Sequence, residues 1–394
     1  MFEQLEALPA DAILRLIAEY NEDPRESKID LGVGVYRNAK GETPVLASVK
    51  EAERRLVAEQ TTKTYVGSGG DPGFNAAMQA LVFGDAAGDR DRIVTLQTPG
   101  GSGSLRVAAG LLLRARPDAR VWASDPTWAN HIPLLGGAGV RLEQYPYYRA
   151  GGAAVRFDEM VEALARVPEG DVVLLHACCH NPTGMDLTPD QWREAAAVIA
   201  SRNLVPFVDI AYQGFADGLE ADAFPVRHLF EHAPEMIVSA SCSKNFGLYR
   251  ERVGSLSLVT ADAAAARAVR SQAFNVVRTM YSMPPDHGAA VVARILGDTE
   301  LRDEWRTELA AMRDRLREMR ALFAAALHEA APGHDFSHIE RARGMFSFLG
   351  IASAQVERLK SEFGVYMVDS SRINVAGVTR ANIDYLADAI AAVL

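Results

Sequence analysis

The sequence predicts an α/β fold, in which a large domain with a mostly parallel sheet covered by helices precedes a smaller α+β domain. Two patterns carry this prediction. Between residues 46 and 300, short apolar runs alternate with segments of helical periodicity, and this order is typical of a parallel sheet with both faces covered. Residues 299–331 then repeat apolar side chains every three or four positions, which predicts one long helix with one buried face.

The N-terminal part contains one predicted helix and one predicted loop. Apolar side chains at helical spacing predict a short amphipathic helix over residues 11–20. Residues 29–44 are rich in glycine and turn formers and read as a loop. We expect 1–45 to form an N-terminal arm and part of the small domain.

The large domain is expected to span residues 46–300, and the small C-terminal domain residues 301–394, entered by the long helix. A chain of 394 residues is long enough for two such domains. Helical patterns and apolar runs that predict strands divide these domains. The predicted helices cover 46–60 and 104–116; the predicted strands cover 92–98, 120–125, 171–179, 204–212, 236–241, 345–351, 366–368 and 372–378.

Composition excludes several classes of protein. The net charge of −10 and a pI near 5.5 argue against a surface for nucleic acid or acidic membranes. No apolar run approaches the ~20 residues that span a bilayer, and the first twenty residues lack the basic start of a signal peptide. With only three cysteines we expect no disulfides, no metal site and a cytoplasmic protein.

A lysine in an unusual place indicates chemistry. In the stretch SASCSKNFGLYRERVG, residues 239–254, Lys244 comes just after a predicted buried strand that ends in small hydroxyl residues. Arg252 follows eight positions later. An amine that is partly desolvated and close to other cations has a lowered pKa, and its neutral form can attack a carbonyl group.

Two other strands end in polar groups. Asp209 interrupts an apolar run, and a buried carboxylate is costly unless it is paired or hydrogen-bonded; alternatively, it caps the next segment. Tyr212 follows three residues later. Asn181 and Pro182 form a turn after another predicted strand, before a helix that Thr188 is expected to cap.

A glycine-rich turn precedes the predicted helix of residues 104–116. Gly100, Gly101, Ser102 and Gly103 leave backbone amides uncovered at a helix start, where phosphate binds well. The spacing does not fit the dinucleotide fingerprint, and a plain turn stays an alternative. After the next strand, Trp128 lies in a predicted loop; it either packs against the protein or covers the flat face of a ring.

Together these groups match pyridoxal 5′-phosphate, which has a phosphate, a flat ring, a ring nitrogen, a phenolic oxygen and an aldehyde. The assigned residues are, in the same order, Gly101, Ser102, Ser241 and Arg252 for the phosphate, Trp128 for the ring, Asp209 for the nitrogen, Asn181 and Tyr212 for the phenolic oxygen, and Lys244 for the aldehyde.

The sequence also resembles a known family. The motifs that carry the resemblance are S-x-S-K-N-F-G-L-Y-x-E-R-V-G, H-N-P-T-G, D-x-A-Y-Q-G-F, D-P-T-W-x-N-H, T-K-T-Y and S-R-I-N. In this order they resemble the class I pyridoxal-phosphate-dependent aminotransferases, in the bacterial aspartate and aromatic amino-acid branch, from about Ile29 to the C-terminus. The resemblance implies an aspartate-aminotransferase-like fold with a seven-stranded sheet, and a homodimer with shared active sites.

The resemblance implies further roles. Lys244 would be the Schiff-base lysine that shuttles the proton, and Asp209 would pair with the ring nitrogen with His131 hydrogen-bonded behind it. Tyr65 would reach the phosphate from the neighbouring subunit. Tyr212 would face the ring hydroxyl.

The substrate would meet residues of both subunits. Arg372 would bind the α-carboxylate, since guanidinium recognises a carboxylate with two hydrogen bonds; by itself it could also be an edge-strand arginine in water. Gly34 would lie in the loop that closes over the substrate, and Trp128 and Asn181 would also contact it. Arg278 of the neighbouring subunit would meet the distal carboxylate of a dicarboxylic substrate.

Departures from the family pattern predict the substrate. Met283 stands where aspartate-directed members carry asparagine, and Ser102 where they carry threonine. A flexible apolar side chain suits a site that also accepts an aromatic ring, whereas Arg278 keeps the site open to aspartate and glutamate. We therefore expect an aminotransferase that moves the amino group of tyrosine, phenylalanine or aspartate to 2-oxoglutarate by a ping-pong mechanism.

Other functions stay open at this point. The alternatives on the same fold are an aspartate-preferring aminotransferase and a pyridoxal-phosphate-dependent β-lyase or decarboxylase; Arg278 argues for transamination. A regulatory binding module would need a basic extension that this acidic chain lacks. A nucleotide-binding protein depends only on the glycine-rich turn.

Overall fold

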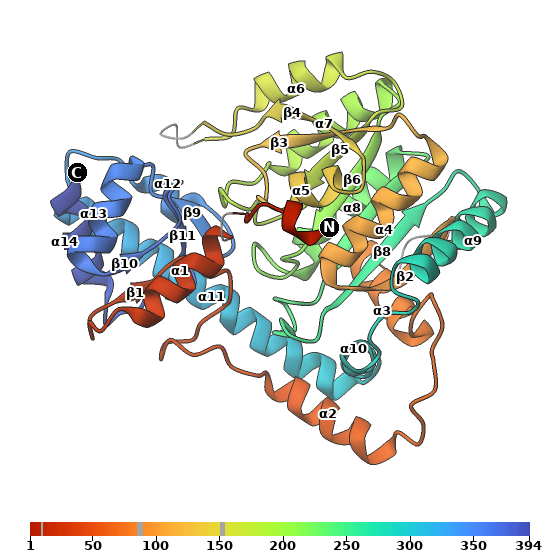
Figure 1. Cartoon of the computed structure of the whole chain (residues 1–394), viewed down its shortest axis with the longest axis horizontal. Helices are drawn as coiled ribbons and strands as arrows, with labels where there is room; N and C mark the ends of the chain where they lie inside the picture. Colours follow the sequence, from red (N-terminus) through yellow and green to blue (C-terminus); the bar gives the residue numbers. More distant parts are fainter. Residues whose placement is uncertain (9–10, 85–89, 150–153) are drawn as a thin grey trace.

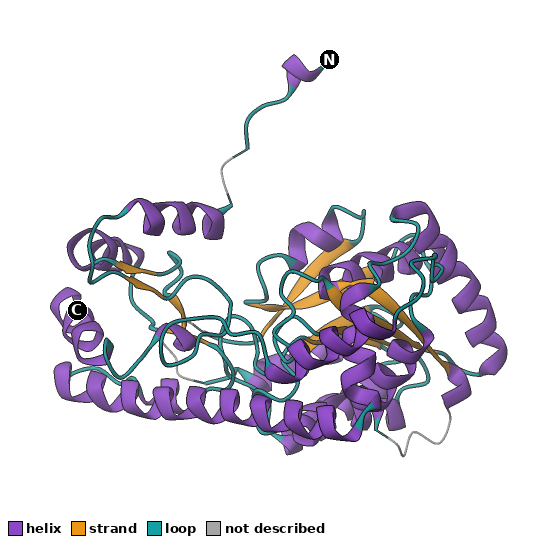
Figure 2. Ribbon diagram, turned by 90° about the horizontal axis from the view of Figure 1, so that it is seen from below, coloured by secondary structure: helices purple, strands orange, loops and turns teal. Residues whose placement is uncertain are grey.

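The computed structural model of the chain consists of two bodies joined by one long helix (Figure 1). It describes residues 1–8, 11–84, 90–149 and 154–394. The large body contains a twisted sheet between layers of helices, and the small body contains two short strand pairs covered by helices. Helix α11, Thr299–Ala330, runs along both bodies (Figure 2), which confirms the predicted long helix.

The central sheet has seven strands in the order β2-β8-β7-β6-β5-β3-β4. All pairs are parallel except those that β8 makes with β2 and β7, so the sheet is mostly parallel, as predicted. The strands are β2 (Ile93–Pro99), β3 (Arg120–Asp125), β4 (Arg141–Pro146), β5 (Val172–His176), β6 (Val205–Ile210), β7 (Met236–Ser241) and β8 (Val253–Val259).

The apolar runs produce buried strands because successive side chains enter opposite layers. In β5, Val172 and Leu174 join one apolar cluster with α4 and α9, whereas Val173 and Leu175 join another cluster on the opposite face. The helices around the sheet are α2 (Ala47–Glu59), α3 (Pro72–Phe83), α4 (Gly100–Ala115), α5 (His131–Gly136), α6 (Phe157–Arg166), α7 (Pro189–Ser201), α8 (Leu219–His232), α9 (Ala263–Met280) and α10 (His287–Gly297), with a 3₁₀ turn η2 (Arg90–Arg92).

Helix α7 begins where the sequence predicts. Thr188 accepts a hydrogen bond from the backbone N–H of Gln191, and the Gln191 side chain accepts one in return from the Thr188 N–H. This reciprocal capping satisfies two amides that the first turn of a helix leaves unpaired. Pro189 at the first helical position has no N–H to lose. The cap therefore fixes the start of α7, which follows the turn that contains Asn181.

The small body is built from both ends of the chain. Strand β1 pairs in parallel with β10, and β9 pairs antiparallel with β11. Its apolar cluster joins Ile29 and Leu31 to side chains from residue 319 onward. Its elements are α1 (Ala12–Glu22), β1 (Ile29–Asp30), α12 (Ser337–Arg341), β9 (Phe346–Phe348), α13 (Ser353–Phe363), β10 (Val365–Tyr366), β11 (Arg372–Asn374), η3 (Val375–Gly377) and α14 (Ile383–Val393); a 3₁₀ turn, η1 (Phe2–Gln4), precedes them.

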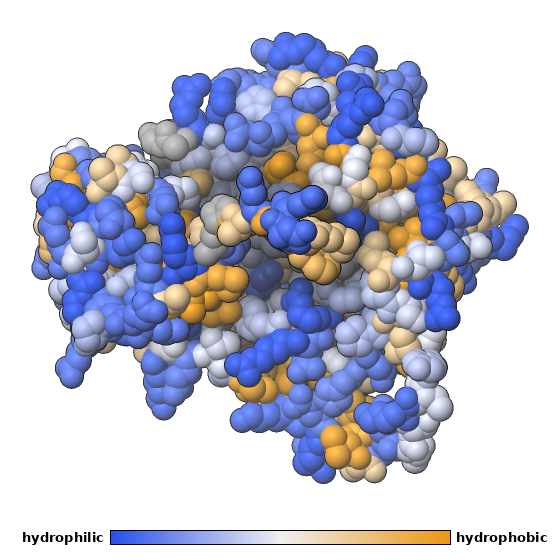
Figure 3. Space-filling model, in the orientation of Figure 1, coloured by the Kyte–Doolittle hydropathy of each residue, from blue (hydrophilic) through white to orange (hydrophobic). Residues whose placement is uncertain are grey.

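Helix α11 connects the two cores. Its side chains from Leu301 to Leu316 pack into the cluster of the large body, and those from Met319 to Leu327 pack into that of the small body. On the face shown in Figure 3 the surface is hollowed between the two bodies. Among the described residues, none of the helices is both apolar and long enough to cross a bilayer.

Candidate active site

A cavity of about 290 Å³ lies at the carboxyl ends of the parallel strands, next to the small body. This edge is where open α/β sheets bind ligands. Most residues singled out in the sequence line it. They are Gly34, Gly101, Ser102, Trp128, Asn181, Asp209, Tyr212, Ser241, Lys244, Arg252 and Arg372.

Lys244 reaches the cavity from the turn that follows β7. Its Nζ lies 4.7 Å from the centroid of the Tyr212 ring. Burial, together with the charge of Arg252, lowers the pKa of the Lys244 amine to about 8, although the carboxylate of Asp209 opposes this shift. About a tenth of the amine is therefore neutral and nucleophilic at pH 7, far more than for an ordinary lysine with a pKa of about 10.4.

This pKa predicts how the protein captures an aldehyde. In protein freed of cofactor, the rate of covalent attachment of pyridoxal phosphate should rise with pH through about 8 and then level off, because only the unprotonated Lys244 amine attacks a carbonyl. Stopped-flow absorbance between pH 6 and 10 measures this rate. A midpoint near 10.4, the value of an unperturbed lysine, would contradict the predicted environment.

Asp209 is held in place from behind by a chain of hydrogen bonds. His131 Nε2 donates to Asp209 Oδ2 at 3.1 Å, Thr127 Oγ1 lies 2.8 Å from His131 Nδ1, and His176 Nε2 lies 3.0 Å from Thr127 Oγ1. If each group donates toward the carboxylate, His176 Nε2 donates to Thr127, Thr127 Oγ1 donates to His131 Nδ1, and His131 Nε2 donates to Asp209.

The same surroundings keep Asp209 ionised. Burial by itself would raise the pKa of this carboxyl, but the hydrogen bond from His131 and the nearby charge of Lys244 hold the pKa below its usual value. Burial lowers the pKa of His176 to about 3, so His176 stays neutral and serves as a hydrogen-bonding group. Asp209 therefore presents a fixed negative charge to whatever occupies the cavity.

An anion cradle lies at the start of α4, where the uncapped amides of the first turn face Arg252. The approach is close, since a Cβ placed on Gly100 would lie 2.5 Å from Arg252 Nη2. The first turn has no acidic residue. Ser241 Oγ lies 3.1 Å from Ser243 Oγ, and among the described residues no carboxylate pairs with Arg252. Helix amides, hydroxyls and an unneutralised guanidinium suit a phosphate.

Arg372, on β11 of the small body, presents a second anion site. Its guanidinium lies 4.5 Å from the centroid of the Phe346 ring, and Nη2 donates to the carbonyl of Gly32 at 2.6 Å. Its Nε is buried and has no hydrogen-bond partner. A buried donor without a partner is costly, and a planar carboxylate would satisfy it. Gly34 lies next to the same ring, because a Cβ there would approach Phe346 Cζ to 3.1 Å.

Of the residues predicted to belong to the site, Tyr65 and Arg278 lie away from the cavity, and His131 lies behind it. Tyr65 is 91% exposed, and Arg278, on the exposed side of α9, donates to Ser282 Oγ at 2.6 Å. Neither lines the cavity of its own chain. His131 is fully buried and contacts Asp209 rather than the cavity.

Sequence reasoning missed other lining residues. Ile13 of α1 and Phe346 of β9 line the cavity from the small body, and Ser243 and Tyr249 line it from the turn after β7. Ser243 and Tyr249 lie inside the stretch that contains Lys244, and this position could have marked them. Ile13 and Phe346 look like ordinary core residues in the sequence, and only the packing of the two bodies brings them to the site.

Comparison with known proteins supports an assignment to a family. Residues 26–390 match the family described as aminotransferase class I and II. The chain belongs to this family. It is 47% identical to the aromatic-amino-acid aminotransferase of Pseudomonas aeruginosa over 394 residues, covering 100% of this chain and 98% of the relative. It is 46% identical to the aspartate aminotransferase of Haemophilus influenzae, and the match covers 100% of both chains.

A solved structure agrees in fold. The aromatic-amino-acid aminotransferase of Burkholderia pseudomallei, covalently bound to pyridoxal phosphate, superposes with a TM-score of 0.97 at 46% identity, covering 100% of this chain and 99% of that one. The predicted aspartate-aminotransferase-like fold is confirmed, as is the prediction of an aminotransferase that depends on pyridoxal phosphate. The β-lyase and decarboxylase alternatives are not favoured.

The cavity fits this cofactor. When bound, pyridoxal phosphate supplies an aldehyde that condenses with amines and a protonated ring that draws electrons from the α-carbon of an amino acid. The residues that would hold it are Gly101, Ser102, Ser241 and Arg252 at the phosphate, Asp209 at the ring nitrogen, Asn181 and Tyr212 at the ring oxygen, Trp128 at the ring face and Lys244 at the aldehyde.

Proposed function

We propose that the protein transfers amino groups from tyrosine, phenylalanine and aspartate to 2-oxoglutarate by a ping-pong mechanism. The observation that carries this proposal is one cavity that contains both the Lys244 amine, with its lowered pKa, and Arg372, whose buried Nε has no partner. The amine can move a proton, and the guanidinium can hold the α-carboxylate of an amino acid beside it. Relatives named for aspartate and for aromatic amino acids support both substrate classes.

Each group of the chain has a distinct task in this proposal. Lys244 would take the proton from the α-carbon of the substrate. It would deliver this proton to the carbon of the cofactor that receives the amino group. Asp209 holds a proton at the ring nitrogen of the cofactor, and His131 fixes the orientation of its carboxylate. Because Arg372 belongs to the small body and Lys244 to the large one, we propose that closure of the bodies excludes water from the site.

We further propose that the active unit is a homodimer. Tyr65 and Arg278 are exposed in the single chain, and neither reaches its own cavity. Phe2, Leu5 and Leu8 lie on an N-terminal segment that projects from the body (Figure 2), and each is at least 74% exposed. Exposed apolar side chains of this kind mark interaction surfaces. In the dimer, Tyr65 would contact the phosphate and Arg278 the distal carboxylate in the partner's site.

The segment after α9 supports a site for aromatic substrates as well. The side chains of Arg278 and Ser282 are hydrogen-bonded, and Ser282 adopts a positive φ of 70° directly before Met283. Arg278 and Met283 therefore belong to one folded segment, and their side chains would approach a substrate together. Arg278 would bind the second carboxylate of aspartate, whereas Met283 would pack against an aromatic ring.

A cytoplasmic location completes the proposal. Cys178, Cys179 and Cys242 are buried and unpaired. Free thiols, two of them adjacent, fit a compartment that keeps cysteines reduced.

The variant Arg278→Ala tests the two substrate classes. We expect kcat/KM for aspartate and 2-oxoglutarate to fall by about 10²–10³-fold, because a charge-assisted contact to the distal carboxylate is lost. Half-reactions with tyrosine and phenylalanine should change by less than about fivefold, since they have no such carboxylate. Single-turnover absorbance with each amino acid measures both.

The control for this experiment is Arg270→Ala, which removes another exposed arginine from α9 and should leave all rates unchanged. Equal losses for both substrate classes in Arg278→Ala would refute the dual site. Light scattering reports the oligomeric state separately. A monomer that turns over both classes normally would contradict the shared sites.

A further inference from the structure

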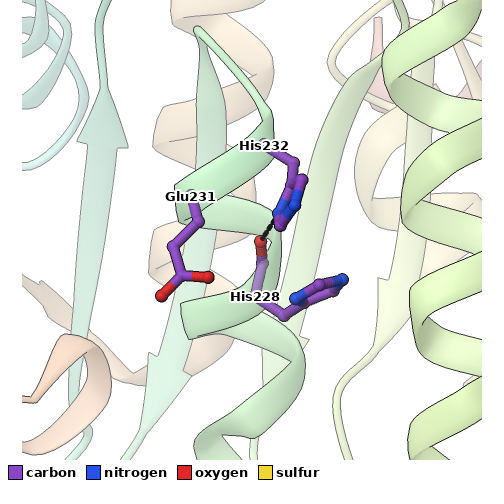
Figure 4. A group of neighbouring side chains, drawn as sticks. All are labelled: His228, Glu231 and His232. Carbon is purple, nitrogen blue, oxygen red and sulfur yellow. Dashed lines mark hydrogen bonds between the residues drawn. The ribbon is translucent and has the colours of Figure 1, made fainter.

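A group of metal-ligating side chains lies outside the active site, on the last turn of α8. His228, Glu231 and His232 each offer one ligand atom, and these atoms all lie within 4.8 Å of one another. Figure 4 shows both imidazoles on one side of the helix. We propose that these three residues, the α8 histidine cluster, bind one divalent transition-metal ion of the zinc type.

The spacing of the ligands is the first argument. Residues four positions apart lie on the same helix face, and the His228 and His232 rings are 4.3 Å apart between centroids. The run HLFEH has the order H-x-x-E-H, in which two imidazoles one turn apart bind zinc. Two nitrogens on a tetrahedral zinc ion are about 3.3 Å apart at ordinary bond lengths, so small side-chain rotations complete the pair.

The orientation of the rings is the second argument. His232 Nδ1 donates to the backbone carbonyl of His228 at 2.8 Å, which leaves Nε2 with its lone pair. A ligating histidine is usually fixed by such a bond from its other nitrogen. The His228 ring stacks on Phe224, with centroids 5.4 Å apart and planes at 12°. Both rings are therefore held in place before a metal arrives, and less freedom is lost on binding.

Charge also favours a cation here. The cluster lies at the carboxyl end of α8, the negative end of the helix dipole. Among the described residues, no lysine or arginine pairs with Glu231, so its carboxylate is available as a third ligand. Two arginines lie nearby without pairing with the cluster. Arg193 lies 5.5 Å from the centroid of the Phe224 ring and is paired with Asp190 at 2.5 Å, and Arg92 donates to the backbone carbonyl of Phe230 at 2.9 Å.

The site is separate from the catalytic cavity. Helix α8 ends just before β7 begins at Met236, and Lys244 follows the opposite end of this strand. Six residues of strand span about 20 Å. A metal ion here would therefore hold the last turn of α8 in place and take no part in transamination. Water would fill the remaining coordination positions.

Calorimetric titration of the holoenzyme with zinc chloride tests the proposal. We expect one site per chain with a Kd on the order of 10 µM, since the protein supplies three ligands and the site is exposed. The double substitution His228→Ala and His232→Ala should weaken binding at least about tenfold, and Glu231→Gln should weaken it less. Cupric ion, added in place of zinc, should give an electron paramagnetic resonance spectrum with nitrogen ligands that the double variant lacks.

His328→Ala is the matched control, because it removes an exposed histidine of another helix and should leave zinc affinity unchanged. The transamination rate of the zinc-loaded holoenzyme should equal that of the metal-free one. Circular dichroism and cofactor absorbance confirm that the variants are folded. Unchanged binding in the folded double variant, or no saturable binding below about 1 mM in the unaltered protein, would overturn the proposal.

Discussion

Lys244→Ala is expected to abolish transamination, with a loss of turnover of about four orders of magnitude or more. Lys244 supplies the one amine among the side chains that line the cavity. The variant thus loses both the covalent link to the cofactor and the group that moves the substrate proton, and proton transfer by itself is worth about 10²–10⁴-fold. Single-turnover absorbance with glutamate measures the loss.

The cofactor should nevertheless stay bound in this variant. The first turn of α4, Ser241 and Arg252 do not depend on the lysine, because the contacts that hold them are made by groups other than the Lys244 side chain. Lys50→Ala, which removes an exposed lysine of α2, is the control and should leave the rate unchanged. Lys244→Arg separates charge from proton transfer: arginine keeps the positive charge but stays protonated, so this variant should be as inactive as Lys244→Ala.

Chemical labelling gives an independent test of the same residue. Borohydride reduction of the holoenzyme should fix the cofactor to one peptide, the one that contains Lys244. Normal turnover of Lys244→Ala, or a label on another peptide of fully loaded protein, would remove the basis of the proposed function.

The strands that sequence patterns predicted are those with continuous apolar runs. β5, β6 and β7 are buried along nearly their whole length, so their sequences carry an unbroken signal. β4 and β8 were missed for opposite reasons. In β4, at the edge of the sheet, Tyr145 is the one fully buried residue. β8 is fully buried, but Gly254, Ser255 and Ser257 interrupt its apolar pattern.

The site residues that the sequence predicted well are those that lie close together in one segment of the chain. Residues next to Lys244 and Asp209 lie at strand ends, and the parallel topology brings those ends to one edge of the sheet. Ile13 and Phe346 could not be found this way, since their role depends on how the small body packs against the large one. Tyr65 and Arg278 carry no local signal either, and only the family resemblance pointed to them.

Asp209→Asn is expected to lower kcat by about 10²–10³-fold while KM changes little. Asparagine has the shape of aspartate and can keep a hydrogen bond to His131, but it lacks the charge that holds a proton at the ring nitrogen of the cofactor. Removing a fixed group that stabilises charge in a transition state costs about this much. Steady-state kinetics with aspartate and with tyrosine should show the same loss, because this charge acts on the cofactor rather than on the substrate side chain.

A second buried aspartate separates this effect from a loss of stability. Asp171, directly before β5, is buried like Asp209; it pairs with Arg120 at 3.0 Å and accepts a hydrogen bond from Trp122 Nε1 at 3.0 Å. Asp171→Asn should lower the melting temperature and leave kcat unchanged. Asp209→Asn should lower kcat and leave the melting temperature unchanged. A kcat within tenfold of the unaltered enzyme in folded, cofactor-loaded Asp209→Asn would show that this charge is not needed.

The pH dependence of the unaltered enzyme follows from the same carboxylate. Because its pKa lies below the usual value, Asp209 stays ionised at a pH where an ordinary aspartate begins to be protonated, and its contribution should be lost only in more acid solution. His131 and Thr127 should affect the reaction because they help to keep the pKa of Asp209 low. His131→Phe removes the hydrogen bond to Asp209 and leaves the buried carboxylate with less support, so its pKa rises. The acid limb of kcat should then move to higher pH, a shift that a purely structural role of His131 would not produce.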